Sequence, residues 1–265
     1  MDKLPTLRCD KTTAYLISFI KEVVFASGFP NAVIGLSGGV DSAVVAALLT
    51  QALGKEHVFA YSLPYTSSNP IHATHAADLS KLFGFPLQTI AIDEQLDLYF
   101  SRYEVTDPVR RGNKMARERM SILFDQAKVH NALVAGTSNK TETLLGYGTW
   151  FGDTAWSFNP IGDIYKTHIS QLAHYLEIPD VIINKPPSAD LWEGQTDEQE
   201  LGFPYSLIDT YLYLKFDLQK STIQLEEDGF NSEFVSNIEL RINSQSFKRV
   251  GGRIASVPLV TFAER

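Results

Sequence analysis

The sequence predicts an α/β fold built on an open parallel sheet, with helices covering both of its faces. Four short apolar runs alternate with segments of helical spacing over residues 12–136. That order is typical of parallel sheets, in which each crossover between strands is a helix. A glycine-rich turn leaves the first apolar run and opens the next helix, which places a ligand-binding loop at the carboxyl end of a strand.

The predicted strands are short apolar runs bounded by turn residues. Residues 32–36 end in a glycine-rich stretch, which indicates a strand buried on both faces. Three further runs follow the same pattern, at residues 58–63, 87–92 and 132–135. After residue 136 the alternation loosens and glycine-rich segments replace the strands.

The predicted helices follow from apolar spacing and from end signals. Thr12 or Thr13 is expected to cap the first helix, which ends at Gly28. Pro70 starts another helix and Gly84 ends it. The remaining predicted helices cover residues 41–53, 94–100, 109–129, 165–176, 205–214 and 232–247.

Composition excludes several classes of protein. The formal net charge of −8 argues against a nucleic-acid partner, which needs a basic surface. No apolar run reaches the ~18 residues of a membrane span, and the N-terminus has no signal-peptide core, so no membrane partner and a cytoplasmic location are expected. The single cysteine, Cys9, fits a reducing compartment. Without repeats or linkers, residues 1–265 are expected to form one domain.

The glycine-rich turn has the features of a phosphate-binding loop. Its glycines let the backbone approach phosphate oxygens, and the first amides of the following helix carry partial positive charge. No lysine follows the glycines, so a metal or basic residues elsewhere must neutralise the phosphates, and Asp41 is the natural metal ligand. The alternative is a tight turn capped by Asp41. The loop consists of Gly35, Leu36, Ser37, Gly38, Gly39, Val40, Asp41 and Ser42.

Basic residues are concentrated in one part of this acidic chain. Six of the 23 lysines and arginines fall between positions 102 and 119. A local cationic patch on an acidic protein suits a small anionic ligand better than a long polyanion. The alternative to a ligand site is a basic stripe that is simply solvated, and it applies more to Arg110 and Arg111 than to Arg117. His72 and His75, three positions apart, are expected at the surface, because no third ligand accompanies them.

The motif Ser-Gly-Gly-x-Asp-Ser resembles the loop of the ATP pyrophosphatases, which split ATP between its α- and β-phosphates to adenylate a substrate. Later segments narrow the resemblance to the bacterial NAD synthetases, especially their short ammonia-dependent branch, over about residues 12–215. Those segments lie at 136–142, 146–149, 151–153, 159–167, 185–191, 195–198 and 200–202. The resemblance implies an adenine nucleotide hydrolase-like, Rossmann-like fold.

The resemblance also implies the reaction and its cofactor. Deamido-NAD, ATP and ammonia would give NAD, AMP and pyrophosphate through an acyl adenylate, with Mg²⁺ as the cofactor and a homodimer as the assembly. The loop would hold ATP, with contacts from Thr137, Lys166 and Ser188, and Lys166 would partly supply the cation that the loop lacks. Asp41 and Glu142 would hold the metal. Glu142 has an alternative role as a carboxylate at a helix start.

Further positions match the dinucleotide site of that family. Arg117 matches a deamido-NAD contact, and Phe247 and Lys248 fall where the family has a His-Lys pair. Trp150 and Ser157 stand where the longer bacterial branch has a lysine and an aspartate, and ring stacking by Trp150 would substitute in part. Asp153, in a Phe-Gly-Asp context, is expected to bind ammonium or to accept a proton from it.

Two other functions stay open on the sequence. One is a different adenylating ATP pyrophosphatase, although the thiolating members need cysteines that this chain lacks. The other is a non-catalytic adenine-nucleotide sensor, which would need the loop but not Asp41, Glu142 and Lys166 together.

Overall fold

The structure is a computed structural model that describes residues 3–186 and 197–249. Its sheet has four strands in the order β3-β2-β1-β4, and every neighbouring pair is parallel. The strands are β1 (Asn31–Gly35), β2 (Val58–Ser62), β3 (Leu87–Thr89) and β4 (Ala132–Val134). The predicted parallel sheet is confirmed. β3 is three residues shorter than the predicted run, because Ile92 already precedes the next helix.

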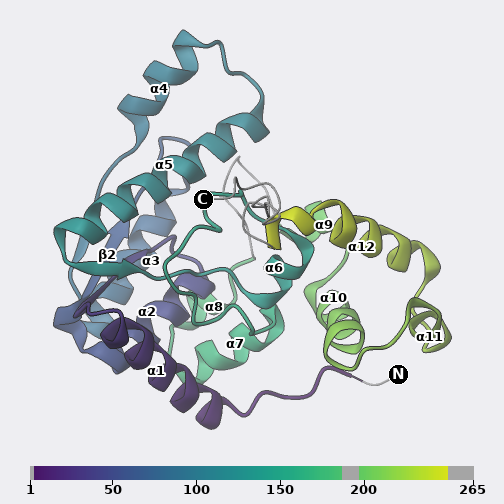
Figure 1. The fold of residues 1–265 in the computed structure, drawn as a ribbon. Coiled ribbons are helices and arrows are strands. Elements are labelled where there is room, and N and C mark those ends of the chain that lie inside the picture. The colour runs from purple at the N-terminus through teal and green to yellow at the C-terminus, as the bar shows by residue number, and fades with distance from the viewer. Residues whose placement is uncertain (1–2, 187–196, 250–265) are drawn as a thin grey trace, which may run out of the picture.

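Helices cover both faces of the sheet, as predicted (Figure 1). Alternate residues of β1 point to opposite faces, so Ala32 and Ile34 pack into one hydrophobic core and Val33 into another. The first core contains residues of α1 (Cys9–Ala26), α2 (Val40–Leu53), α3 (Pro70–Phe83) and α7 (Lys166–Tyr175). The second contains residues of α4 (Asp93–Arg102) and α5 (Pro108–Val129).

The starts of α3 and α1 show where local sequence signals determine a helix end and where they do not. At α3 the Asn69 side chain accepts a hydrogen bond from the Ile71 amide at 3.1 Å, and Gly84 ends the helix in the left-handed region with φ 79°. The start predicted for α1 is wrong: the helix begins at Cys9, and Thr13 lies buried inside it. The extra turn forms because Leu7 and Cys9 pack against the first core, so tertiary contacts override the threonine cap signal.

A third, helical core lies beside the sheet and contains Leu145, Tyr205, Tyr211 and Phe234. Its helices include α6 (Lys140–Leu145), α9 (Asp197–Leu201), α10 (Tyr205–Leu212), α11 (Thr222–Glu227) and α12 (Ser232–Ser244). The short helices α6, α9, α11 and α8 (Asp180–Ile183) were not predicted, because four to six residues carry too little periodicity. The predicted helices 205–214 and 232–247 end earlier, each followed by a turn, at Tyr213–Asp217 and Ser246–Arg249.

The carboxylate of Asp209 joins the helical core to the sheet-covering helices. It is fully buried, and it accepts hydrogen bonds from the Thr141 hydroxyl at 2.5 Å and from the amide and hydroxyl of Thr167, both at 2.8 Å. These bonds hold α10 against the starts of α6 and α7. A single domain over residues 1–265 stays a prediction.

The N-terminal segment also crosses between these two parts of the molecule (Figure 1). Leu4 packs against the helical core, and the carbonyl of Pro5 lies 2.8 Å from Nε2 of His168. Within residues 3–186 and 197–249, no helix has the length and apolarity that crossing a bilayer would require.

Replacing Asp209 tests this junction. Asp209→Ala leaves the buried hydroxyl of Thr141 and the half-buried amide and hydroxyl of Thr167 without this acceptor, and a buried donor left unpaired costs about 1–3 kcal/mol. The free energy of unfolding, measured by urea titration, is expected to fall by at least ~3 kcal/mol. Asp180→Ala is the matched control, because its side chain is 80% exposed, and it should change stability by less than ~0.5 kcal/mol. Equal effects of the two substitutions would contradict the junction.

Candidate active site

The candidate site lies at the carboxyl ends of β1 and β4, where the loops that follow these two strands diverge. β1 pairs with β2 on one side and with β4 on the other, so the loops after β1 and β4 diverge at the carboxyl edge of the sheet. Ligands bind at such switch points in open α/β sheets. A cavity of about 830 Å³ opens there, a size suited to a nucleotide. Both loops line it, as do the start of α3, part of α12 and Lys248.

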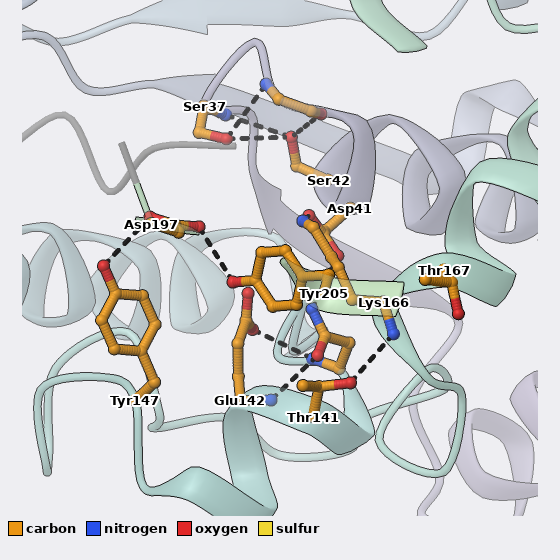
Figure 2. A network of polar contacts seen from close by, with 12 residues as sticks. Ser37, Asp41, Ser42, Thr141, Glu142, Tyr147, Lys166, Thr167, Asp197 and Tyr205 are labelled. Atoms are coloured by element: carbon orange, nitrogen blue, oxygen red, sulfur yellow. Dashed lines mark hydrogen bonds and ion pairs between the residues drawn. The ribbon is translucent and has the colours of Figure 1, made fainter. Parts of the chain in front are cut away.

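The phosphate loop is held in shape by its own serines (Figure 2). Ser42 Oγ donates to the Gly39 carbonyl at 3.0 Å and accepts from the Ser37 amide at 3.3 Å. Ser37 Oγ lies 3.2 Å from Ser42 Oγ and accepts from the Gly39 amide at 3.2 Å. Gly38 has φ 73°, and a Cβ there would lie 2.5 Å from the carbonyl oxygen of His72. The loop therefore needs glycine at position 38, and hydrogen bonds within the loop support its conformation.

An ion pair links this loop to α7. Asp41, in the first turn of α2, accepts a hydrogen bond from Lys166 Nζ, and from Asn139 Nδ2 at 3.0 Å. Lys166 is the first residue of α7 and is 7% exposed. Burial opposes its charge, but the negative charges of Asp41 and Glu142 outweigh burial and raise the pKa of Lys166. The charge of Lys166 is thus paired with that of Asp41.

Glu142 lies at a helix start, as one of the two alternatives from the sequence has it, and its role as a metal ligand stays a prediction. In a capping box at the start of α6, its carboxylate accepts from the Asn139 amide at 3.1 Å, and its own amide donates to Asn139 Oδ1 at 2.9 Å. Glu142 also lines the cavity, as does Thr137. Burial among protein atoms, together with the negative charge of Asp41, raises the pKa of Glu142 to about 8.

Asp197 is a third acidic group near Lys166, and sequence reasoning gave it no role. It is 4% exposed and accepts hydrogen bonds from the hydroxyls of Tyr147 at 3.0 Å and Tyr205 at 3.1 Å (Figure 2). Burial raises the pKa of Asp197, while the charge of Lys166 lowers it. Only its place in the segment 195–198 pointed to it, because the sequence does not distinguish Asp197 from the neighbouring acidic residues Glu198 and Glu200.

The acidic groups suit a magnesium ion that arrives with a nucleotide. Among the described residues, no group of three or more His, Cys, Asp or Glu side chains is arranged to hold a metal by itself. Magnesium is usually bound by one or two carboxylates plus substrate phosphates. Asp41 and Glu142 line the same cavity as the phosphate loop, and the charge of Asp41 already raises the pKa of Glu142, so a cation between them would relieve repulsion.

Asp153 also lines the cavity. Its Oδ1 accepts a hydrogen bond from the Thr149 amide at 2.6 Å. Surrounding protein atoms raise the pKa of Asp153, although nearby amides and the charges of Lys248 and Arg119 lower it. Lys248 Nζ donates to the carbonyls of Gly146 at 2.9 Å and Gly148 at 2.8 Å, which fixes the loop before Asp153.

The predicted dinucleotide residues divide into two groups. Trp150 lies edge to face with Phe247, with ring centroids 5.3 Å apart, and its carbonyl accepts from Arg117 Nε at 3.3 Å. Arg117 lines a smaller pocket that shares Asn113 with the main cavity. Ser157 lies elsewhere, accepting a hydrogen bond from the Val134 amide at 3.2 Å beside the sheet. Ser188 falls outside the described residues.

The two predicted surface histidines differ from expectation. His75 is only 4% exposed, so that prediction is wrong for it, because one face of α3 packs against the first core. His72 lines the cavity.

Comparison with known proteins gives one consistent family. The family model for NAD synthase matches residues 12–251. A curated NH(3)-dependent NAD(+) synthetase of Fusobacterium nucleatum is 50% identical over 242 residues, covering 91% of this chain and 94% of that protein. The corresponding protein of Trichlorobacter lovleyi is 47% identical, covering 88% and 86%.

Solved structures agree with this family. The NH3-dependent NAD synthetase of Campylobacter jejuni superposes with a TM-score of 0.81 at 36% identity, covering 94% of this chain and all of that one. An NMN synthetase of Francisella tularensis superposes with a TM-score of 0.83 at 31% identity, covering 96% and 99%.

The raised pKa of Glu142 predicts a pH-dependent stability in metal-free, nucleotide-free protein. The folded state holds the proton up to about pH 8, whereas the unfolded state loses it near 4.5, so wild-type stability should fall as pH rises between these values. Glu142→Gln removes this cost, and its stability relative to wild type should rise across the same window. Urea unfolding in EDTA across the window measures this difference. A difference that does not change with pH would contradict it.

Proposed function

This chain belongs to the NAD synthase family, and we propose that it amidates deamido-NAD with ammonia, consuming ATP to AMP and pyrophosphate. It is a carbon–nitrogen ligase. The observation that best supports the chemistry at this site is the phosphate loop in one cavity with Asp41, Glu142 and Lys166. A nucleotide sensor on the same fold would have no need of that carboxylate–lysine cluster.

The reaction needs activation because a carboxylate is a poor electrophile. The nicotinate carboxylate oxygen attacks the α-phosphorus of ATP, and pyrophosphate leaves with the electron pair of the broken bond. Ammonia then attacks the carbonyl carbon of the acyl adenylate, AMP leaves, and the nitrogen loses a proton. Positioning and charge stabilisation dominate both steps.

In this proposal, residues of the phosphate loop and of the loop after β4 bind ATP. Asp41 and Ser42 line the cavity in the first turn of α2, and the amides of that turn would donate to phosphate oxygens. Thr137 and Lys166 also line the cavity. Ser188 keeps its expected ATP contact as a proposal only.

Magnesium would be held by Asp41 and Glu142 together with phosphate oxygens. Bound there, the ion would neutralise charge that develops on the phosphates. Lys166 would then be released from full engagement with Asp41 and would have a donor to offer to the nucleotide. Glu142 would lose its proton, because a metal ligand must be ionised.

Ammonia is proposed as the direct nitrogen donor, with Asp153 placed to accept its proton. Asp153 lines the cavity and its pKa is raised, so it holds a proton more readily than an aspartate with the ordinary pKa. Hydrolysis of glutamine would need a reactive thiolate. Cys9 is the single cysteine; burial raises the pKa of its thiol, which lies 3.8 Å from the Leu7 carbonyl, far from the phosphate loop in sequence.

The dinucleotide would be bound by Arg117, Trp150, Phe247 and Lys248, with Ser157 as the weakest member because its hydroxyl already binds the backbone. Arg117 donates to the Trp150 carbonyl. To bind the dinucleotide, its guanidinium would either leave this carbonyl or donate to the carbonyl and the ligand together. Because one of the similar solved structures is an NMN synthetase, deamido-NMN is the alternative substrate to test.

The reaction can be tested on purified protein with Mg²⁺, ATP and ammonium. Deamido-NAD should give NAD, AMP and pyrophosphate in equal amounts, quantified by chromatography, and glutamine in place of ammonium should give almost none. Deamido-NMN, assayed in parallel, should have a kcat/KM at least ~10-fold lower. Release of ADP and phosphate would contradict adenylation, and a preference for deamido-NMN would reassign the substrate.

A homodimer is part of this proposal. Apolar side chains lie exposed on α4 and α5, among them Leu98 at 65%, Val109 at 55% and Val129 at 66%. Light scattering at micromolar concentration should give twice the chain mass of 29.5 kDa. Leu98→Lys should shift the mass towards the monomer, because a buried charge is costly at an interface. A fully active monomer would contradict the assembly.

A further inference from the structure

Arg241 is a cation on the cavity wall and is not among the predicted site residues. It lies in the last turn of α12 and lines the cavity. Its guanidinium carbon lies 5.1 Å from the centre of the Tyr147 ring, which is a cation–π contact. Nε of Arg241 is buried, yet among the residues that the structure describes it has no hydrogen-bond partner. A buried donor on a charged group is costly to leave unpaired, so an acceptor from a ligand would be favourable there.

Arg241 is linked through Tyr147 to the end of the cavity where ATP is expected. The Tyr147 hydroxyl donates to Asp197 at 3.0 Å (Figure 2). Asp197 is in turn one of the acidic groups whose charge bears on Lys166. The guanidinium of Arg241 therefore adjoins the carboxylate cluster but forms its contact with a ring and not with a carboxylate.

Arg241 is also close to the end of the cavity where Asp153 lies. Burial lowers the pKa of Lys248, the charge of Asp153 opposes this, and the charge of Arg241 lowers the pKa further. Arg241 and Asp153 are thus both near one ammonium group. That ammonium donates to the carbonyls of Gly146 and Gly148, whereas Nε of Arg241 has no such acceptor in the described part of the chain. Of these two cations, Arg241 is the one whose contacts favour an anionic ligand.

We propose that Arg241 binds the nicotinate carboxylate of deamido-NAD and selects this substrate over the product NAD. This inference rests on the proposed function. The carboxylate has to reach the α-phosphorus of ATP first and ammonia afterwards, so it belongs between the two ends of the cavity that Arg241 adjoins. A guanidinium can donate two parallel N–H bonds to one carboxylate, which gives orientation as well as affinity.

The contact changes when the substrate becomes the product. In deamido-NAD the guanidinium meets a negatively charged carboxylate. In NAD it meets a neutral amide, whose NH₂ group is a donor and cannot accept from Arg241. The product therefore loses both the charge pairing and one of the two acceptors, and it should be held less tightly than the substrate.

The test is the calorimetric affinity for deamido-NAD and for NAD, measured on the wild type and on Arg241→Met. Loss of a charge-assisted pair should weaken deamido-NAD binding about tenfold or more and leave NAD binding within about threefold. Arg241→Lys keeps the charge without the planar fork, so it should recover part of the affinity for deamido-NAD. Lys81→Met is the control and should change neither affinity, because Lys81 does not line the cavity and 80% of its side chain is accessible.

Two outcomes would overturn the inference. One is an affinity for deamido-NAD that is unchanged in Arg241→Met. The other is an equal loss for deamido-NAD and NAD, because a contact with the shared phosphates, or damage to the cavity wall, would affect both ligands alike. Wild-type turnover of deamido-NAD is measured on the same preparation. If that turnover is present and the ratio of the two affinities does not depend on Arg241, only this inference fails; if turnover is absent, the proposed function fails.

Discussion

The ion pair between Asp41 and Lys166 joins the two halves of the candidate site. Asp41 sits where β1 passes into α2, and Lys166 starts α7, 125 positions later. Asn139 adds a second hydrogen bond to Asp41 and also caps α6, which carries Glu142. The loops after β1 and β4 are therefore tied together through one carboxylate. Because Lys166 is almost fully buried, its charge has to be met by these groups and not by water.

This constraint explains the behaviour of the surrounding carboxyl groups. Burial and the charge of Asp41 raise the pKa of Glu142 to about 8, although the charge of Lys166 lowers it, and Asp197 accepts hydrogen bonds from two tyrosine hydroxyls. Such a site is poised for a cation, since a metal arriving with phosphates would ionise Glu142 and let Lys166 turn to the nucleotide.

Much of the fold and part of the site could be predicted from local sequence. The alternation of apolar runs gave the parallel sheet, and Gly38 and Asp41 identified a loop whose conformation depends on a few neighbouring residues. The pairing of Asp41 with Lys166 and the burial of Asp197 and Asp209 could not be predicted, because they arise between elements far apart in the chain. The same is true of the extra turn of α1, which packing stabilises against the cap signal.

The most direct test of the central ion pair is a double-mutant cycle on the ligand-free protein. The free energies of unfolding of Asp41→Asn, Lys166→Met and the double variant would be measured by urea titration in EDTA. A pair that joins the two halves of the site should give a coupling free energy above ~1 kcal/mol, with the double variant more stable than the sum of the single losses implies. Additivity within ~0.5 kcal/mol would contradict the account.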